Sequence, residues 1–537
     1  MRRSRWKGVQ SQLWSRATFC WSGTSPMKID RSMGAEGQLL HTIIAHAGKR
    51  PYAPAFSCGG VHLTWEDFAA AILDVAGTIA AEFGERKQQP VALVGVNSAE
   101  LVIAYLAIVA AGQCAVPLPV SANAETLAGM LSDCRPNLVF TDRVGFDLIG
   151  SEGAERIVAI GFSQTSTKDW DEFAIENAKL ETPVAMSGTD DFNIIYSSGT
   201  TARPKGIVQS HAMRYRQAAR ATFGLGPAST MLLATPLYSN TTLMPLLATL
   251  CHGGNVVLMQ KFSAAGYLDP AEEVSATHTM LVPIQYQRLL GEPDFVRRDL
   301  SAFVVKQSTG APLASAMKRD LTAYWPGKLL EVYGLTEGGC TSILDVGAHP
   351  DCYHTVGRPA PGNDIRIIDE AGTELPAGEV GEIVGCSPTM MTRYFRNPQA
   401  TEAFYWRDAE GQKFHRTGDI GLIDEAGFLV LRDRKKDVII SGGFNVYASD
   451  LERVLLDHPD IEDAAVIAVP SQKWGETPLG LVVMKEGVTA DLSEVCAWAN
   501  GRLGSMQRLS RVEVRPTLPR SPAGKMLKQD LKKPYWA

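Results

Sequence analysis

The sequence lacks the signatures of several protein classes. Its nine cysteines are scattered between Cys20 and Cys496 without a C-x-x-C pair, which argues for reduced thiols and against a disulfide framework or a zinc site. With 52 basic and 58 acidic side chains, the net charge of −6 provides no basic footprint for a nucleic acid. The sequence contains neither the Gly-Lys-Ser/Thr run of a Walker A loop nor a Gly-x-Ser-x-Gly nucleophile elbow. We therefore expect no nucleic-acid partner and no serine nucleophile of that type.

Long apolar runs are missing as well. In the first half of the chain the longest one, residues 101–111, is shorter than the roughly 20 residues that cross a bilayer. It predicts a buried helix, and we expect no integral membrane segment and a cytoplasmic protein. The first 26 residues contain five basic side chains and no acid. We expect residues 1–33 to be a disordered or non-native extension, with a transit peptide as the alternative.

The body of the chain alternates between strand and helix patterns. Residues 91–96 are continuously apolar, as in a strand buried on both faces, and Asn97 with Glu100 resembles a capping box for the helix that follows. Such alternation predicts parallel sheets with helices on their faces. The other predicted strands are 115–120, 137–141, 231–235, 255–259, 279–282, 303–306 and 329–332, and the other helices are 39–46, 124–133 and 243–250.

The pattern changes twice after residue 356. Frequent glycine and proline with short strands at 364–368, 381–385 and 427–431 predict a β-rich subdomain. The charged run 432–437 then marks a domain boundary. Beyond it, a compact α+β unit is predicted, in which Ser449 and Glu452 cap a helix. Its strands are expected at 438–440, 464–469, 479–485 and 512–515, and its helices at 450–457 and 492–503.

One loop, residues 196–206, is unusually rich in polar groups. It contains five hydroxyl groups, two glycines and Lys205, and it follows the end of a predicted strand. Backbone N–H groups, hydroxyls and a lysine can surround an anion, and glycine permits close approach. A polar surface turn is the alternative, and taken alone the loop does not decide between the two.

Four further motifs follow this loop in order. They are Tyr-Gly-Leu-Thr-Glu at 333–337, Arg-Thr-Gly-Asp at 416–419, the stretch 434–445, and Gly524-Lys525. From about residue 40 to the end, the chain resembles the adenylate-forming superfamily, which includes acyl-CoA synthetases, peptide-synthetase adenylation domains and firefly luciferase. Each motif alone is moderately specific, whereas five in this order are highly specific.

The resemblance implies that the loop holds the β- and γ-phosphates of ATP. The implied contacts are Ser197, Ser198, Gly199, Thr200, Thr201 and Lys205. Ala202 departs from the pattern, because the family usually has glycine there. If that position requires a positive φ, alanine costs on the order of 1 kcal/mol, although another turn would avoid this cost.

The resemblance assigns the rest of the nucleotide site to later motifs. The implied adenine pocket consists of Gly310, Ala311, Pro312 and Tyr333. Thr336 matches the α-phosphate contact, and Glu337 matches the ligand of Mg²⁺, which on ATP takes one or two protein carboxylates. Asp419 resembles the carboxylate that accepts both ribose hydroxyls, and Arg434 resembles its companion.

The last implied roles concern the C-terminal part. Lys436 matches the hinge, and Gly442 and Gly443 match the turn that reaches the site when CoA enters. Lys525 resembles the lysine between the substrate carboxylate and the α-phosphate, where charge develops. The nearby lysines are expected to form only a solvated face: Lys528, Lys532 and Lys533.

The implied fold is α/β and α+β multidomain. We expect an N-terminal adenylation domain at 34–433, with two doubly wound parallel-sheet subdomains and a β-rich subdomain. A hinge at 434–437 and a small mobile α+β domain at 438–537 follow.

The expected reaction joins a carboxylic acid to CoA with release of AMP and pyrophosphate. Residues 235–243 contain no acid to pair an amino group, which argues against an amino-acid substrate. Ser239 stands where many acyl-CoA synthetases have histidine, and the flanking leucines are expected to pack a core helix. We expect an apolar acid of medium or long chain length.

Several alternatives stay open at this point. One alternative is that the acid is aromatic or alicyclic. Another is that the acyl group is loaded onto a separate carrier protein. A nucleotide-binding protein without catalysis is a third hypothesis, against which Glu337, Asp419 and Lys525 together argue. The assembly is also open, with a homodimer compatible with the sequence.

Overall fold

The structure is a computed structural model. It describes residues 37–151, 153–197, 204–220, 223–442, 444–488, 490–504, 507–520 and 526–536, so the predicted extension at 1–33 lies outside the described part. Within these ranges no helix is long and apolar enough to cross a membrane. All eight cysteines of the described part are free thiols, as expected from their spacing.

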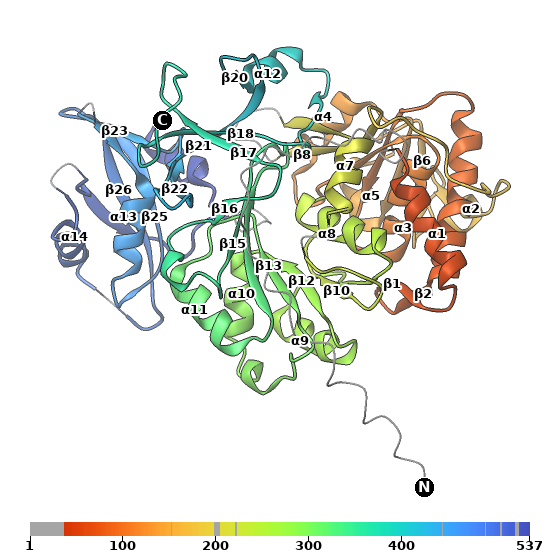
Figure 1. Ribbon diagram of the computed structural model, residues 1–537, viewed down its shortest axis with the longest axis horizontal. Helices are drawn as coiled ribbons and strands as arrows, with labels where there is room; N and C mark the ends of the chain where they lie inside the picture. Colours follow the sequence, from red (N-terminus) through yellow and green to blue (C-terminus); the bar gives the residue numbers. More distant parts are fainter. Residues whose placement is uncertain are drawn as a thin grey trace, which may run out of the picture. The chain divides into compact units, whose positions relative to one another are not determined.

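Two parallel sheets contain most strands of the N-terminal part (Figure 1). The first parallel sheet has eight strands, in which β9 pairs antiparallel with both β8 and β19 and all other neighbours pair parallel. In spatial order they are β19 (Arg393–Tyr394), β9 (Lys205–Ser210), β8 (Asp191–Ser197), β4 (Cys114–Leu118), β3 (Pro90–Val94), β5 (Leu138–Asp142), β6 (Arg156–Ile160) and β7 (Lys168–Asp169).

The second parallel sheet has nine strands and antiparallel strands at both edges. In spatial order they are β16 (Arg358–Pro359), β15 (Thr341–Asp345), β14 (Lys328–Gly334), β13 (Val305–Ser308), β12 (His278–Leu281), β10 (Thr230–Leu233), β11 (Asn255–Leu258), β1 (Pro54–Cys58) and β2 (Val61–Thr64). Strand β12 is fully buried and β10 is buried except at Thr230, as their continuous apolar runs predict.

Helices cover the faces of both sheets. One hydrophobic core cluster combines side chains of both sheets with those of α1 (Leu39–Lys49), α2 (Trp65–Phe83), α3 (Ala99–Ala110) and α8 (Asn240–Cys251). Every residue of α3 except Glu100 is buried, which agrees with the predicted buried helix. The remaining helices of this part are α4 (Ala124–Cys134), α5 (Arg143–Ile149), α6 (Trp170–Ala174), α7 (His211–Ala218), α9 (Ala264–Glu273), α10 (Pro283–Leu290) and α11 (Ser315–Tyr324).

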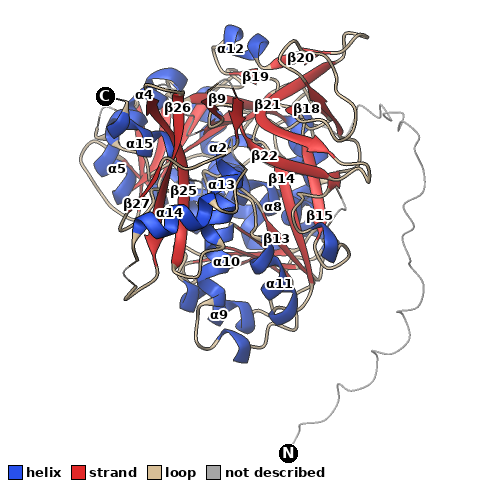
Figure 2. Ribbon diagram, turned by 90° about the vertical axis from the view of Figure 1, so that its left-hand side faces the viewer, coloured by secondary structure: helices blue, strands red, loops and turns tan. Residues whose placement is uncertain are grey.

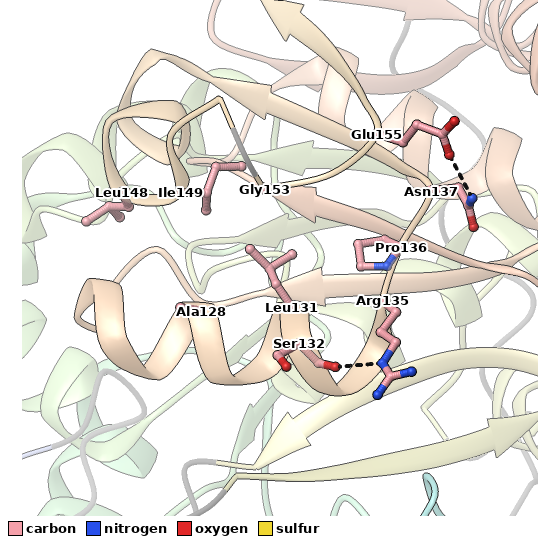
Figure 3. A pocket seen from close by; sticks show the side chains of 10 residues that line it. All are labelled: Ala128, Leu131, Ser132, Arg135, Pro136, Asn137, Leu148, Ile149, Gly153 and Glu155. Atoms are coloured by element: carbon pink, nitrogen blue, oxygen red, sulfur yellow. Dashed lines mark hydrogen bonds between the residues drawn. The ribbon is translucent and has the colours of Figure 1, made fainter.

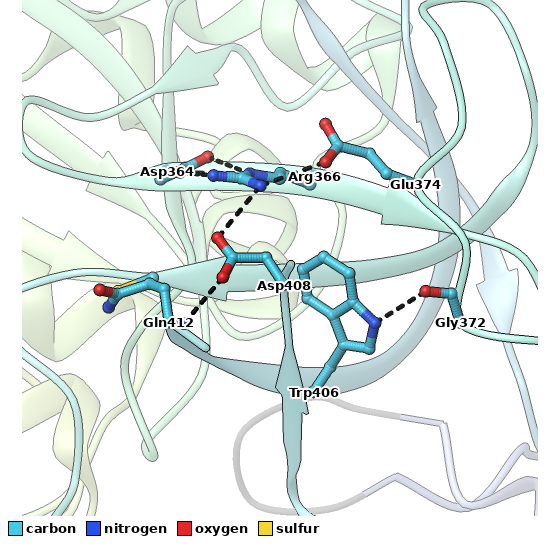
Figure 4. A network of polar contacts seen from close by, with 8 residues as sticks. Asp364, Arg366, Gly372, Glu374, Trp406, Asp408 and Gln412 are labelled. Atoms are coloured by element: carbon cyan, nitrogen blue, oxygen red, sulfur yellow. Dashed lines mark hydrogen bonds and ion pairs between the residues drawn. The ribbon is translucent and has the colours of Figure 1, made fainter. Parts of the chain in front are cut away.

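The predicted β-rich subdomain is a third, antiparallel sheet. It contains β17 (Asp364–Ile368), β18 (Gly381–Cys386), β21 (Lys413–Ile423), β20 (Tyr405–Arg407) and β22 (Leu429–Arg434), with α12 (Pro398–Ala403) beside it. On its surface Arg366 binds Asp364, Glu374 and Asp408 at 2.8, 3.1 and 3.4 Å (Figure 4). This network joins strands and loops, and it contains no residue of the predicted site.

The C-terminal part is the expected α+β unit (Figure 2). Its strands are β24 (Phe444–Val446), β23 (Ile439–Ser441), β26 (Gly475–Met484), β25 (Ile461–Ser471) and β27 (Arg511–Val514), of which only β27 is parallel to its neighbour. Its helices are α13 (Ala448–Leu456), α14 (Leu492–Asn500) and α15 (Lys528–Lys532). The fold class is therefore confirmed.

Two predicted helix caps are wrong. Ser98, not Asn97, caps α3, because its hydroxyl accepts from the N–H of Leu101. Asn97 instead donates to the carbonyls of Thr235 and Met259, and so it joins the first sheet to the loop before α8.

The cap predicted for the C-terminal unit fails for a similar reason. The Ser449 hydroxyl donates to the Arg432 carbonyl, and Glu452 accepts from the Val466 N–H. Both side chains bond residues distant in sequence, which a local pattern does not reveal.

Candidate active site

The polar loop connects two adjacent strands of the first sheet. Strands β8 and β9 pair antiparallel, with Ser197 opposite Lys205 and Tyr196 opposite Gly206. The connection between them includes Ser198, Gly199, Thr200, Thr201 and Ala202, which lie outside the described residues. The structure therefore places the two ends of the predicted phosphate loop at one end of a strand pair.

Tyr394 brings Lys205 and Glu337 together. The Lys205 ammonium lies 5.1 Å from the centre of the Tyr394 ring, and the Tyr394 hydroxyl donates to Glu337 Oε1 at 2.9 Å. Burial and the Glu337 charge raise the pKa of Tyr394, so the phenol stays a hydrogen-bond donor. Nothing in its local sequence distinguishes this tyrosine from a core aromatic, and sequence reasoning missed it.

Tyr333, Asp419 and Arg434 form a second cluster. The Tyr333 hydroxyl on β14 donates to Asp419 Oδ2 at 2.7 Å, and Arg434 Nε lies 3.7 Å from Asp419 Oδ1. Asp419 and Arg434 are opposite each other in the pairing of β21 with β22. Burial and the Asp419 charge raise the pKa of Tyr333. Three residues from three strands, each predicted to contact the nucleoside, thus lie together.

The segment 310–312 lies beside this cluster. It follows β13, whose parallel neighbour β14 ends at Gly334, so both segments leave the same edge of the sheet. Gly310 has a φ of +88°, a conformation that favours glycine. The N–H of Leu313, next after Gly310, Ala311 and Pro312, donates to the buried Glu331 at 2.7 Å, which fixes the end of the segment.

The predicted hinge is bound to the antiparallel sheet through Glu382. This buried carboxylate on β18 accepts from Arg416 at 2.5 Å and from Lys435 at 2.9 Å. Burial alone would raise the pKa of Glu382, but the bonds from Arg416 and Lys435 outweigh it and lower the pKa. Lys436, the predicted hinge residue, is exposed.

Two of the three lysines expected to be a solvated face are not. Lys528 lies 2.8 Å from Glu452, and Lys532 lies 3.9 Å from Asp437; both lysines are largely buried. The expectation was wrong because their acidic partners come from α13 and the predicted hinge, far away in sequence. Only Lys533, paired with Asp530 on the surface, fits it.

The predicted C-terminal site residues are only partly placed. Gly442 has a φ of +59° and donates its N–H to the Trp474 carbonyl at 2.9 Å. Gly443 and Lys525 lie outside the described residues. Residues 520 and 526 form an antiparallel bridge, so the segment with Lys525 connects two paired positions.

The region expected to select the acid begins α8. Ser239 caps this helix by accepting from the Thr241 N–H, and the Tyr238 hydroxyl bonds that of Ser121 at 2.9 Å. Leu243, Leu246 and Leu247 are buried in the shared core, which confirms their packing role.

A surface depression of about 600 Å³ lies elsewhere, between α4 and α5 (Figure 3). Its lining includes Leu131, Arg135, Ile149 and Glu155. None of the predicted site residues lines it, so we place no part of the active site there.

Comparison with known proteins identifies the family of this chain. The profile of the AMP-binding enzyme family matches residues 44–395, and that of the AMP-binding enzyme C-terminal domain matches residues 450–525. The chain belongs to this family and hence to the adenylate-forming superfamily. It is an enzyme of the AMP-forming acid–thiol ligase class.

Similar proteins differ in acid and acceptor. A fatty acid–[acyl-carrier-protein] ligase, ScoC of Streptomyces coeruleorubidus, is 29% identical over 93% of this chain and 96% of its own. A feruloyl-CoA synthase of an Amycolatopsis species is 29% identical over 92% and 98%. The crystal structure of ATP-bound MatB from Rhodopseudomonas palustris has a TM-score of 0.83 and 26% identity, covering 93% of this chain and 99% of that one.

Proposed function

We propose that the protein is an AMP-forming carboxylic acid–CoA ligase whose substrate is an apolar fatty acid of medium or long chain length. The observation that carries the proposal is the convergence of distant motif residues in two clusters, Lys205–Tyr394–Glu337 and Tyr333–Asp419–Arg434. The first suits the phosphates of a nucleotide and the second its nucleoside. ATP use is supported by the ATP-bound MatB structure, and CoA use by the CoA ligases among the relatives.

In the first step, a carboxylate oxygen of the acid attacks the α-phosphorus of ATP. The bond to pyrophosphate breaks, and an acyl-adenylate forms. Such a transfer needs positioning and charge neutralisation more than a protein nucleophile. We assign Ser197–Thr201 and Lys205 to the leaving pyrophosphate, and Thr336 and Lys525 to the charge at the α-phosphate.

The nucleoside is held by the second cluster. We assign the Tyr333 ring and residues 310–312 to adenine. The Asp419 carboxylate accepts from both ribose hydroxyls, supported by Arg434. The 3.7 Å separation of Arg434 and Asp419 leaves acceptor capacity for these hydroxyls.

Glu337 fits a magnesium ion that ATP brings with it. Within the described residues no group of three or more His, Cys, Asp or Glu side chains forms a metal site. A single carboxylate suits Mg²⁺, because the metal keeps its phosphate oxygens and most of its waters. When bound, Mg²⁺ would neutralise phosphate charge, while Tyr394 orients the Glu337 carboxylate.

In the second step, the CoA sulfur attacks the acyl carbonyl, the bond to AMP breaks, and a thioester forms. We propose that the domains 34–433 and 438–537 change their relative pose between the steps about the hinge 434–437, which brings Gly442 and Gly443 to the site. The two family profiles fall within these two ranges.

The choice of acid rests on the region 235–243. It contains no carboxylate, so a substrate ammonium would stay unpaired there. Relatives act on fatty and aromatic acids, and on CoA and carrier proteins. An aromatic or alicyclic acid, or a carrier-protein acceptor, is therefore the second candidate.

A pyrophosphate-release screen tests the proposal. Fatty acids of graded length and cinnamate-type acids are each incubated with ATP and Mg²⁺, with and without CoA, and thioesters are identified by mass spectrometry. We expect CoA thioesters of apolar acids and loss of adenylate formation in Lys525→Ala. ATP binding without turnover of any acid would contradict it. A cytoplasmic location and a homodimer complete the proposal, to be tested by fractionation and light scattering.

A further inference from the structure

Helix α7 carries a buried arginine, Arg214, that has no acidic partner among the described residues and bonds residues of β8 and α8. Arg214 on α7 has no exposed surface, and no carboxylate among the described residues bonds it. Its partners are the amide oxygens of Asn193, Gln217 and Asn240 at 2.8, 2.7 and 2.8 Å. The guanidinium is always charged, and a buried charge without a counter-ion opposes folding. Arg214 is therefore expected to have a role other than stabilising the fold.

The hydrogen bonds continue from Arg214 in one direction. Asn193 Nδ2 donates to Gln209 Oε1 at 3.1 Å, and Gln209 Nε2 donates to the carbonyl of Thr336 at 2.8 Å. Arginine has only donors and a carbonyl only accepts, so both intervening amides must point the same way. Asn193 and Gln209 are fully buried, and the bond between them is shielded from water.

The two ends of this series of hydrogen bonds, Asn240 and Thr336, lie in two different motifs. Asn240 is the first residue of α8, directly after Tyr238 and Ser239 in the region that selects the acid. Thr336 belongs to the 333–337 motif at the phosphates. Asn193 and Gln209 lie on β8 and β9, the two strands that carry the polar loop. A single buried chain thus connects α8, both loop strands and the Thr336 turn.

We propose that Arg214, Asn193 and Gln209 are positioning residues that hold the Thr336 turn, and with it Glu337, in register with the phosphate loop. The assignment rests on the proposed function, because it assumes that Thr336 faces the α-phosphate. The residues touch no reacting atom themselves. They act by holding the Thr336 carbonyl through a series of hydrogen bonds. Arg214 sets the donor-to-acceptor direction of these bonds, because it can only donate.

The first test is Gln209→Glu, which keeps shape and volume. The carboxylate still accepts from Asn193 but has no N–H for the Thr336 carbonyl, so only the last bond is lost. We expect MgATP affinity, measured by calorimetry, and kcat/KM for ATP to fall about 10- to 100-fold. Decanoate and cinnamate serve as the acids in the kinetic assay.

The matched control is Gln113→Glu. Gln113 is equally buried in the first sheet's framework and donates its Nε2 to the Arg86 carbonyl at 2.7 Å. The same change there removes a buried amide–carbonyl bond away from the site. We expect a similar fall in Tm with MgATP affinity within about twofold of the wild type.

The second variant, Asn193→Asp, separates positioning from folding. Aspartate supplies Arg214 with a counter-ion, so we expect an equal or higher Tm. An aspartate at position 193 has no N–H to donate to Gln209 Oε1. We expect the Gln209 amide to flip, so that its N–H donates to the aspartate and its oxygen faces the Thr336 carbonyl oxygen, which it repels. A stable protein with kcat/KM for ATP reduced about tenfold supports the proposal.

Wild-type MgATP affinity and kcat/KM in both Gln209→Glu and Asn193→Asp would overturn it, whatever the change in Tm. Equal kinetic losses in Gln113→Glu and Gln209→Glu would overturn it too, because the effect would then be general destabilisation. If the wild type turns over no acid, the proposed function fails, while the MgATP affinities of the variants still decide this inference.

Discussion

Asp419 and Glu382 are two carboxylates of the same antiparallel sheet, and their surroundings differ in a telling way. Glu382 is buried between Arg416 at 2.5 Å and Lys435 at 2.9 Å. Asp419 has one close donor, Tyr333 at 2.7 Å, and an arginine at 3.7 Å. The saturated carboxylate binds Lys435 of the predicted hinge to the sheet, whereas the loosely bound one retains acceptor capacity. Hydrogen-bond saturation separates their roles better than burial.

Replacing the unsaturated carboxylate should have the largest effect on activity. Asp419→Asn keeps the shape but loses the charge and one acceptor toward the ribose hydroxyls. We expect adenylate formation to fall about 100-fold or more, with Tm nearly unchanged. Pyrophosphate exchange and thermal unfolding measure the two quantities. A large loss of Tm with normal exchange would reverse the roles assigned to the two carboxylates.

Replacing the saturated carboxylate should act chiefly on stability. Glu382→Gln leaves Arg416 and Lys435 without their counter-ion, and because both are partly exposed, we expect about 1–3 kcal/mol lower free energy of unfolding. Urea denaturation measures it. Adenylate formation should change less than in Asp419→Asn.

The same carboxylate predicts a pH dependence. The folded protein lowers the pKa of Glu382 below its ordinary value of 4.5, so its contribution to stability is complete above that value. It is lost as pH falls through the lowered pKa. The stability difference between wild type and Glu382→Gln should therefore be constant from pH 7 to about 5.5 and shrink below 4.5. A difference that grows on acidification contradicts this.

Tyr333→Phe removes the close donor of Asp419 and keeps the aromatic ring. We expect a smaller effect, about threefold to tenfold in KM for ATP, because the ring still stacks on the base while the carboxylate is less well oriented. Steady-state kinetics at saturating acid measure it. An effect as large as that of Asp419→Asn would assign the hydroxyl a direct role.

Lys435→Met should have the smallest effect. Half of this side chain is exposed, so its pair with Glu382 contributes about 1 kcal/mol or less, and high salt should weaken it. Because Lys435 lies in the predicted hinge, we expect the ratio of thioester to adenylate formation to shift while Tm stays constant. As a control, 1 M salt should remove most of the difference in this ratio between the wild type and Lys435→Met.

Sequence patterns predicted the elements of this fold well and their partners poorly. The apolar runs of β3, β10 and β12 indicated buried strands within about two residues. The antiparallel addition of β9 and β19 to a parallel sheet was not predicted, since pairing depends on residues far apart in sequence. Ser449 and Lys528 were misread for the same reason, because their partners Arg432 and Glu452 come from other elements.

The candidate site shows the same division. Ordered motifs indicated Tyr333, Asp419 and Arg434, and the structure brings them into one cluster. Tyr394 and the chain Arg214–Asn193–Gln209 had no signal, because a buried amide or tyrosine in a strand resembles any core position. Only their mutual distances reveal them.

The position of β1 has a consequence for the synthesis of the protein. This strand is made early, yet its parallel partner is β11, with Phe56 opposite Val256, 200 positions later. At ~5–20 residues per second, β1 waits about 10 to 40 s for that neighbour on the ribosome. Its side chains Ala55 and Phe56, which are buried in the folded protein, lack this neighbour during that time. We therefore expect slow codons between the two strands to lower the yield of folded enzyme.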